Sequence, residues 1–477
     1  MRVCVPVCAK SFAELEDAAE RASQFADIIE LRLDYLDPRE LVLEIENFVK
    51  KLSRPIILTF RPSEQGGYRI LKRPEREAFW RTEWGALANS LFDIEFDLVN
   101  ESSFDWPRVI VSHHDFDGVP EDLEQIYERL AATPAHIVKI AVRANEITDC
   151  IPVFHLLDRA SNEKRELIAN AMGNAGIATR ILGPSRGAYL TYGSVEAESA
   201  TAPGQVNAHQ LRSVYHVDDI DDHTMICGLV GLPVMHSVSP HMHNAAFAAA
   251  GVNGVYLPLE VRDIDAFVKR MVHPKTREIE WNLRGLSVTA PHKSSVIELL
   301  DWVDAEAREI GAVNTVVVKD HGLYGYNTDV YGFIEPLRER VGPLADARVA
   351  VIGAGGASRA AVWALRRDGA SVTVFARDPR KGEPLAGASF AGYDVVINAT
   401  PQSPATTDQL VGAGLVYDLI YNPMETEFLL QGRAAGCDTL GGLPMLAAQA
   451  RRQFELWTGT TPCAKLMYDS AAAALRQ

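Results

Sequence analysis

Long apolar runs are absent from this 477-residue sequence. No stretch is long enough to span a bilayer, and the N-terminal segment MRVCVPVCAKS lacks the extended apolar core of a signal peptide. Basic residues are fewer than acidic ones, 47 against 63, which gives a formal net charge of −16, and they form no basic stripe. We therefore expect a cytoplasmic protein with neither a membrane nor a nucleic acid as its partner.

Cysteine is scarce, and its spacing does not suit a metal site. The six cysteines are scattered along the chain, which predicts reduced, buried thiols rather than a disulfide framework. His236, His241 and His243 lie close together in sequence, but no carboxylate or cysteine joins them at ligand spacing. We therefore expect no metal.

The length of the chain predicts two domains. A chain of 477 residues exceeds what one hydrophobic core usually organises, and two domains of roughly 220 to 250 residues each are the natural division. The acidic run at residues 218–223 cannot bury itself, and it precedes the strand-like segment MICGLVG. The sequence therefore predicts one domain over residues 1–222 and another over residues 223–477.

Apolar runs alternate with helical patterns throughout the first half. The eight runs are VCVPVC, IIELRL, PIILTF, FDIEFDL, VIVSH, IVKIAV, LIANAM and AYLTYG. Strands that alternate with helices form parallel sheets, and eight such units in about 200 residues predict an α/β fold, a small (β/α)8 barrel.

Polar residues occur late in several of these predicted strands or just after them. They are Glu30, Arg32, Arg61, His113, His114 and Lys139. In a barrel such positions gather at the C-terminal mouth, where catalytic residues lie. Any one of them alone would suit a solvated loop, but six on four strands favour a site.

Lys139 lies within the apolar segment IVKIAV. Loss of solvation disfavours the ammonium form, so we expect a lowered pKa and a nucleophilic amine that can form an imine with a ketone. The alternative is a lysine that extends to the surface from a strand end. His113 and His114 support the first interpretation, because a histidine can move the proton that an imine acidifies. Strand alternation places the two histidines on opposite faces, so we expect one of them to be catalytic.

Arg32, Arg61 and Arg180 are candidates for binding a carboxylate, which an arginine holds with a bidentate fork. Ordinary ion pairing is equally consistent with each of them. The residues alone thus indicate imine chemistry on an anionic keto acid, and both an aldolase and a dehydratase fit.

Five motifs occur in this order along the first half of the sequence: ELRLD, TFRPSEQGG, SHHDF, VKI and TAPGQ. Together they resemble the motifs of type I 3-dehydroquinate dehydratases. The resemblance implies that Lys139 forms the imine, that His114 is the general acid and base, and that water is lost from 3-dehydroquinate to give 3-dehydroshikimate. The substrate-binding residues that it implies are Glu30, Arg32, Arg61, Arg180, Thr201 and Gln205. Two positions depart from the family pattern, since Gln65 stands where Glu is frequent and Thr201 where Ser is frequent.

The second half contains the run RVAVIGAGGASRAAVWAL, which reads as a strand, a glycine-rich turn and a helix. Backbone N–H groups and the helix N-terminus in this arrangement receive a pyrophosphate. Arg377 and Lys381 follow the next predicted strand and favour NADP over NAD, because an arginine there accommodates the 2′-phosphate. The adjacent Asp378 is the counter-argument.

Two further segments carry candidate residues. Ser237 and Ser239 lie in GLPVMHSVSPHMHN, where a helix cap and a substrate contact are equally good interpretations. Lys293 and Asp329 are far apart in sequence, so that only the fold can bring them together, and a surface lysine with a capping aspartate is the plain alternative.

The ordered motifs GLPVMHSVSPHMHN, SVTAPHK, GAVNT, YNTD, GAGGASR, NATP, YDLIYNP and MLAAQA resemble those of shikimate dehydrogenases. The resemblance implies a two-lobed unit: a substrate lobe at about 223–330 plus C-terminal helices, and a Rossmann-like NADP-binding lobe at about 331–445. It makes Lys293 and Asp329 the catalytic pair. The implied substrate contacts are Ser237, Ser239, Thr289, Asn314, Tyr421 and Gln449. The implied cofactor contacts are Gly353, Ala354, Gly355, Gly356, Ala357, Arg377, Lys381, Leu419 and Gly442.

The product implied for the first site is the substrate implied for the second. The sequence therefore predicts two consecutive steps, from 3-dehydroquinate through 3-dehydroshikimate to shikimate, with small molecules as the partners. Two alternatives stay open: a second half that acts on quinate with NAD as a candidate cofactor, and a regulatory or scaffolding protein without turnover.

Overall fold

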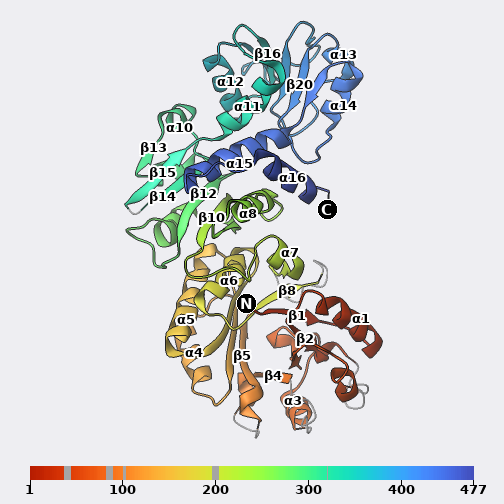
Figure 1. Cartoon of the computed structure of the whole chain (residues 1–477), viewed down its shortest axis with the longest axis vertical. Coiled ribbons are helices and arrows are strands. Elements are labelled where there is room, and N and C mark those ends of the chain that lie inside the picture. Colours follow the sequence, from red (N-terminus) through yellow and green to blue (C-terminus); the bar gives the residue numbers. More distant parts are fainter. Residues whose placement is uncertain (37–44, 82–89, 100–103, 196–203, 320, 477) are drawn as a thin grey trace. The chain divides into compact units, whose positions relative to one another are not determined.

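The computed structural model of the chain describes residues 1–36, 45–81, 90–99, 104–195, 204–319 and 321–476 (Figure 1). The chain forms two compact units. The first comprises Met1–Ile226, Val230–Met235 and Asn253–Leu283, and the second comprises Cys227–Leu229, His236–Val252 and Arg284–Gln477. The predicted domain division at residue 222 stays a prediction.

The N-terminal part of the chain forms a curled parallel sheet, seen in the red-to-yellow ribbon of Figure 1. Its strands are β1 (Val3–Val7), β2 (Ile28–Arg32), β3 (Ile56–Thr59), β4 (Ser90–Glu95), β5 (Val109–Asp115), β6 (Ile137–Arg143), β7 (Glu166–Met172), β8 (Thr191–Ser194) and β9 (Val206–Asn207). They pair in the order β7-β6-β5-β4-β3-β2-β1-β8-β9. Each of the eight predicted runs overlaps one of the strands β1 to β8, and their order around the sheet is that of the predicted barrel.

Helices, several of them amphipathic, follow most of these strands. They are α1 (Phe12–Ser23), α3 (Arg73–Trp80), α4 (Leu123–Ala131), α5 (Cys150–Glu163), α6 (Ile177–Leu182) and α7 (Ala208–Ser213). Leu123, Ile126, Tyr127 and Leu130 of α4 show the pattern, because they recur at helical spacing and all four are buried.

A layer of apolar side chains fills the inside of the curled sheet. Its buried members lie on the strands or just before them, and they are Cys4, Ile28, Ile57, Ile110, Ile137, Ile168, Leu190 and Tyr192. Side chains two positions apart on a strand share a face. The residues that follow these by two, such as Glu30 after Ile28 and Lys139 after Ile137, therefore lie on the same inner face, one layer closer to the C-terminal ends of the strands.

A six-stranded mixed sheet follows in the chain. Its strands are β10 (Met225–Gly231), β11 (Gly254–Glu260), β12 (Leu283–Val288), β13 (Trp302–Val303), β14 (Thr315–Lys319) and β15 (Gly322–Tyr326). Their order in the sheet is β11-β10-β12-β14-β15-β13, and β14 is antiparallel to both β12 and β15. The helices of this region are α8 (Ser239–Ala250), α9 (Ile264–Phe267), α10 (Ala305–Ile310), α15 (Gly442–Thr458) and α16 (Ala464–Ala474).

A second six-stranded sheet is parallel and Rossmann-like, as predicted. Its strands are β16 (Arg348–Ile352), β17 (Ser371–Ala376), β18 (Glu383–Pro384), β19 (Val395–Asn398), β20 (Leu415–Asp418) and β21 (Asp438–Leu440). Their order is β18-β17-β16-β19-β20-β21, so the strand order reverses beside β16. The helices are α11 (Asp329–Val341), α12 (Gly356–Arg367), α13 (Thr407–Leu410) and α14 (Glu427–Ala434). Ligands of open α/β sheets bind at such a switch point.

The cysteines form no disulfide, as predicted. All six are free, and Cys4, Cys150, Cys227 and Cys437 are buried. The expectation of burial is wrong for Cys463, which is exposed because it precedes the first turn of α16. No described helix combines the length and the apolarity that crossing a membrane requires.

The apolar layer inside the barrel yields a stability prediction. Ile168 is fully buried in this layer, so Ile168→Ala leaves a cavity and should lower the free energy of unfolding by about 2–5 kcal/mol. Ile70→Ala is the matched control, because its side chain is 77% exposed, and it should change the free energy by less than about 0.5 kcal/mol. Urea unfolding read by hydrogen exchange of the barrel peptides measures both, and equal effects would contradict the assigned layer.

Candidate active sites

The first site lies on the inner face of the curled sheet, one layer above the apolar residues. A pocket there is lined by charged and polar side chains from six strands and the segments after them. The lining residues include Glu30, Arg32, Arg61, Gln65, His114, Lys139, Asn170, Arg180, Tyr192 and Gln205. All of the predicted residues of this site that the structure describes therefore come together. Thr201 lies outside the described residues.

Lys139 is at the centre of this site and only 4% exposed. Its Nζ donates to Asp93 Oδ2 at 2.7 Å, to the Tyr192 hydroxyl at 2.8 Å and to Glu30 Oε1 at 3.4 Å. Thr59 Oγ1 also donates to Glu30 Oε1, at 2.7 Å. The alternative of a lysine that reaches the surface is therefore wrong, because the strand directs the side chain inward toward two carboxylates.

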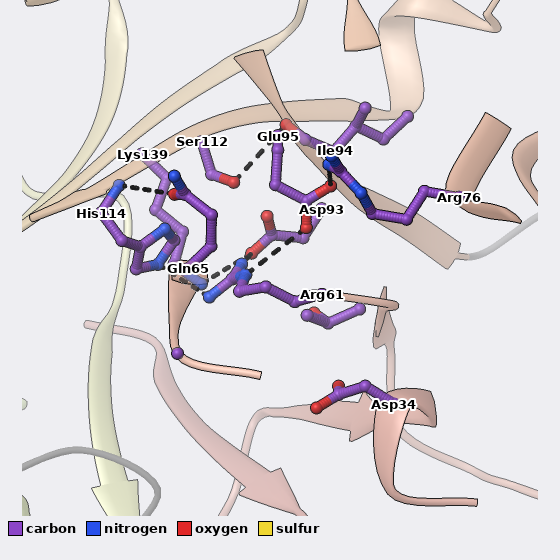
Figure 2. Close-up of polar contacts among 12 residues, drawn as sticks. Asp34, Arg61, Gln65, Arg76, Asp93, Ile94, Glu95, Ser112, His114 and Lys139 are labelled. Atoms are coloured by element: carbon purple, nitrogen blue, oxygen red, sulfur yellow. Dashed lines mark hydrogen bonds and ion pairs between the residues drawn. The ribbon is translucent and has the colours of Figure 1, made fainter. Parts of the chain in front are cut away.

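Asp93 joins Lys139 to the next group of the site. Figure 2 shows the carboxylate of Asp93 between Lys139 and Arg61, whose Nη2 donates to Asp93 Oδ2 at 2.5 Å. Burial acts to raise the pKa of Asp93, but Arg61 and Lys139 outweigh it and hold the pKa below its ordinary value. Asp93 is thus a buried anion that accepts hydrogen bonds from two cationic side chains.

Arg61 in turn contacts His114, with 2.7 Å between Nη1 and the imidazole Nε2. A guanidinium can only donate, so Nε2 accepts and the ring proton is assigned to Nδ1. Burial, Arg61 and Lys139 all lower the pKa of His114, well below its ordinary value. His114 is therefore neutral near pH 7 and available as a base. His113 does not line the pocket, as alternation along β5 predicts.

Two of the three arginines expected to bind a carboxylate, Arg32 and Arg61, already contact acidic side chains of the protein. Arg32 forms a fork with Asp34, with Nε–Oδ1 at 3.0 Å and Nη2–Oδ2 at 2.9 Å, and Arg61 contacts Asp93. Arg180 is buried, which lowers its pKa to about 10. The structure confirms where these arginines lie, while their contact with a substrate stays a prediction.

Asp93 and Tyr192 were not among the predicted site residues. Both lie on the inner face by the alternation that placed Glu30 and Lys139 there. Asp93 follows the partly buried Leu91 by two positions, so the two-residue period of β4 indicates that Asp93 faces inward. An aspartate inside an apolar strand could have been recognised as a candidate by the same argument as Lys139.

In the second site, the fold brings the distant Lys293 and Asp329 together. Nζ of Lys293 donates to Asp329 Oδ2 at 2.6 Å, and Asn314 Nδ2 donates to the other carboxylate oxygen at 2.8 Å. Asp329 is the first residue of α11, where the positive end of the helix dipole stabilises an anion. Asn314 Nδ2 also lies 3.5 Å from Gln449 Oε1, which joins α15 to the pair.

The remaining predicted substrate contacts lie in loops or at helix ends. Ser237 Oγ accepts from the backbone N–H of Ser239 and contacts its hydroxyl at 3.1 Å, at the start of α8. The cap interpretation is wrong for Ser239, because Val238 is the N-cap of α8 and makes no side-chain cap hydrogen bond, while a contact of these serines with the substrate stays a prediction. Thr289 directly follows β12, and Tyr421 follows β20 by three residues.

The glycine-rich turn between β16 and α12 fits a dinucleotide. Gly353 has φ +122°, and a Cβ there would meet Thr400 and Ala399 at 3.0–3.1 Å, so the turn itself requires glycine. A Cβ on Gly355 or Gly356 would meet no protein atom within 4 Å. The described protein gives no packing reason for these two glycines, and the open space beside the N-terminus of α12 suits a pyrophosphate.

One pocket connects this turn to Lys293 and Asp329. Its lining includes Lys293, Asp329, Gly356, Ala357 and Leu419. A cofactor bound along the turn would therefore extend toward the lysine. Gly442 begins α15 close to the carbonyl of Leu419, because a Cβ there would lie only 2.4 Å from that oxygen.

The end of β17 carries the residues predicted to select NADP. Arg377 directly follows the strand and lines a surface pocket. Asp378, the counter-argument in the sequence, contacts Arg380 through both carboxylate oxygens, at 3.0 and 2.9 Å. Its charge is therefore already paired, which leaves Arg377 and Lys381 as the cationic candidates beside the turn. No cluster of three or more His, Cys, Asp or Glu within the described ranges could hold a metal.

Comparison with known families gives three matches along the chain. The models described as type I 3-dehydroquinase, the substrate-binding domain of shikimate dehydrogenase and the C-terminal domain of shikimate 5′-dehydrogenase match residues 3–222, 229–316 and 442–471, respectively. Among solved structures, "Dehydroquinate dehydratase and shikimate dehydrogenase from S. pombe AroM" is 26% identical, covers 99% of this chain and 98% of its own, and has a TM-score of 0.45. Shikimate 5-dehydrogenase from Thermus thermophilus, solved with NADP(H) and shikimate, is 34% identical over 53% of this chain and all of its own, with a TM-score of 0.47.

Two curated relatives carry the names of the same enzymes as the matching family models. An NADP(+) shikimate dehydrogenase of Moorella thermoacetica is 41% identical over 50% of this chain and 88% of its own length. A bifunctional chloroplastic 3-dehydroquinate dehydratase/shikimate dehydrogenase of Arabidopsis thaliana is 32% identical, and the match spans 98% of this chain and 83% of that protein. The chain therefore belongs to the family of bifunctional 3-dehydroquinate dehydratase/shikimate dehydrogenases.

Proposed function

We propose that the chain catalyses two consecutive reactions: dehydration of 3-dehydroquinate to 3-dehydroshikimate through an imine on Lys139, and NADPH-dependent reduction of 3-dehydroshikimate to shikimate with Lys293 and Asp329. The buried amine of Lys139, in one pocket with the neutral imidazole of His114, is the observation that carries the first reaction. The family of the whole chain supports the pairing of the two activities.

In the first reaction, the Lys139 ammonium gives up two protons, which leave with the carbonyl oxygen as water, while Nζ bonds to the carbonyl carbon, and the result is a protonated imine. The positive nitrogen withdraws electrons and acidifies the neighbouring C–H group. The neutral His114 takes that proton at Nε2, exchanging its contact with Arg61 for the substrate, and then protonates the departing hydroxyl. Hydrolysis of the imine releases the product and restores Lys139.

In the second reaction, Lys293 supplies the proton. NADPH, when bound, provides the hydride for the carbonyl carbon. Asp329 holds Lys293 Nζ at 2.6 Å, and the ammonium donates to the carbonyl oxygen, stabilises the charge that develops there and transfers its proton. Asn314 fixes the second oxygen of Asp329, so the carboxylate keeps its orientation.

The substrate and cofactor contacts are part of the same proposal. We assign the first substrate to Glu30, Arg32, Arg61, Arg180, Thr201 and Gln205, and the second to Ser237, Ser239, Thr289, Asn314, Tyr421 and Gln449. The cofactor contacts are the turn residues Gly353 to Ala357 together with Arg377, Lys381, Leu419 and Gly442. The quinate and regulatory alternatives find no support in the family matches. The cytoplasmic location and the absence of a nucleic-acid partner stay predictions, and the Arabidopsis relative is described as chloroplastic.

The two reactions should be separable by single substitutions. Lys139→Ala removes the nucleophile and should lower the dehydratase kcat by at least about a thousandfold while NADPH-dependent reduction persists. Lys293→Ala should do the reverse, because each lysine serves one pocket. The assays are product absorbance for dehydration and NADPH consumption for reduction. Loss of both activities in either variant would contradict two independent sites.

The low pKa of His114 predicts the pH dependence of dehydration. A base is active when it is deprotonated, so a pKa lowered below 6.5 moves the acidic limb of kcat/KM to a pH below 6.5. Activity should therefore stay constant as the pH falls from 7.5 to about 6.5. The pH profile of kcat/KM for 3-dehydroquinate measures this, and a limb centred at or above pH 6.5 would contradict a desolvated His114.

Arg377 should select the cofactor. Arg377→Ala removes the proposed 2′-phosphate contact and should raise KM for NADPH by about tenfold or more, with little change in KM for NADH. Arg380→Ala is the matched control, because Arg380 is 87% exposed and contacts Asp378. If both variants have the same KM for NADPH, or if Arg377→Ala weakens NADH equally, the assignment is wrong.

A further inference from the structure

Imine formation on Lys139 needs a group that supplies protons to the carbonyl oxygen, because that oxygen must leave as water. A side chain within hydrogen-bond distance of Nζ can take a proton that the nitrogen loses and also reach the oxygen, which is attached to the carbon that Nζ attacks. Among the residues that the structure describes, three side chains lie at that distance: Asp93, Glu30 and Tyr192.

Two of these three side chains can only accept a proton. Lys139 and Arg61 hold Asp93 anionic against its burial. Burial also acts to raise the pKa of Glu30, but Lys139 and Arg32 outweigh it and hold this pKa below its ordinary value. An ionised carboxylate has no proton to donate. Neither group therefore carries a proton of its own for the carbonyl oxygen at neutral pH.

Tyr192 differs from the carboxylates because its hydroxyl both accepts and donates. It accepts from Lys139 Nζ at 2.8 Å, and within the described part of the chain its own proton has no recorded acceptor. Burial and Glu30 raise the pKa of Tyr192 well above its ordinary value, so the side chain stays a phenol. Tyr192 is 6% exposed and lines the same pocket as Lys139 and His114.

His114 is less well placed for this step. Its Nε2 contacts Arg61, and the structure records no hydrogen bond between the imidazole and Nζ among the residues it describes. His114 therefore suits the later transfer at carbon, whereas Tyr192 touches the nitrogen that reacts.

We propose that the hydroxyl of Tyr192 is a catalytic proton relay for formation and hydrolysis of the imine on Lys139. The proposal rests on the dehydration assigned to the barrel above and adds a residue to it. It concerns the steps at nitrogen and oxygen, and leaves the proton transfer at carbon to His114.

The relay balances without another reactant. Starting from the ammonium, Tyr192 takes one proton from Nζ and gives its own to the carbonyl oxygen while Nζ bonds to the carbonyl carbon and the π electrons move to oxygen. A second transfer of the same kind gives the oxygen its second proton. Water then leaves with the C–O electron pair, and the lone pair of nitrogen forms the C=N bond. Two protons have moved from nitrogen to oxygen, and Tyr192 is again a phenol.

Rapid mixing with 3-dehydroquinate, followed by a borohydride quench at increasing times and mass analysis, tests the relay. Tyr192→Phe keeps the ring and removes the hydroxyl, and should lower the rate constant for adduct formation by about a hundredfold. Tyr189→Phe is the matched control, because it removes a hydroxyl three residues earlier and should trap at the wild-type rate. A misfolded fraction would lower the amplitude of trapping but not its rate constant.

The outcomes are separable. A Tyr192→Phe rate constant equal to that of the wild type overturns the relay while the dehydration stands, whereas a wild type that forms no adduct overturns the dehydration itself. Complete loss of adduct in Tyr192→Phe supports the relay if hydrogen exchange of β6 and β8 matches that of the wild type. Complete loss with unprotected β8 assigns Tyr192 a structural role and overturns the relay.

Discussion

The hydrogen bond between Lys139 and Asp93 is the contact on which the first site depends. Burial of an isolated ammonium would be costly, and the carboxylate offsets that cost while it orients Nζ. The same carboxylate holds Arg61, and Arg61 holds His114. One buried anion thus positions the proposed nucleophile, Lys139, and, through an arginine, the proposed base, His114. Because buried charge pairs gain little net stability, this arrangement is better explained by the geometry of catalysis than by the stability of the fold.

The proposed chemistry of each site depends on a proton of a lysine. The surroundings of the two lysines differ. Lys139 is enclosed on the inner face of a sheet, where its charge is balanced by buried carboxylates. Lys293 is partly accessible, and its partner Asp329 gains further stabilisation from the N-terminus of α11. A nucleophilic amine benefits from exclusion of water, whereas an amine that donates a proton to substrate benefits from access to solvent for the proton's replacement. The local environments match the two proposed chemistries.

Much of this arrangement could be predicted from the sequence, because strand alternation is local information. The eight apolar runs predicted the strands, the position of Glu30, His114 and Lys139 late in these runs or just after them predicted a shared mouth, and alternation separated His113 from His114. The local period could have placed Asp93 and Tyr192 on the inner face as well, but their contacts with Lys139 come from pairing between distant strands, which brings β4 and β8 to the same lysine. The contacts of Lys293 with Asp329 followed only from the resemblance, since no local pattern joins residues so far apart. The contact between Asp378 and Arg380 could not be predicted from the sequence, because it depends on the geometry of the two side chains.

Peptide mapping after borohydride reduction in the presence of 3-dehydroquinate tests the central claim most directly. The account predicts a single reduced adduct on the peptide that contains Lys139, with the peptide that contains Lys293 unmodified. A stable adduct on any other lysine, or turnover without a trappable adduct on Lys139, would contradict it.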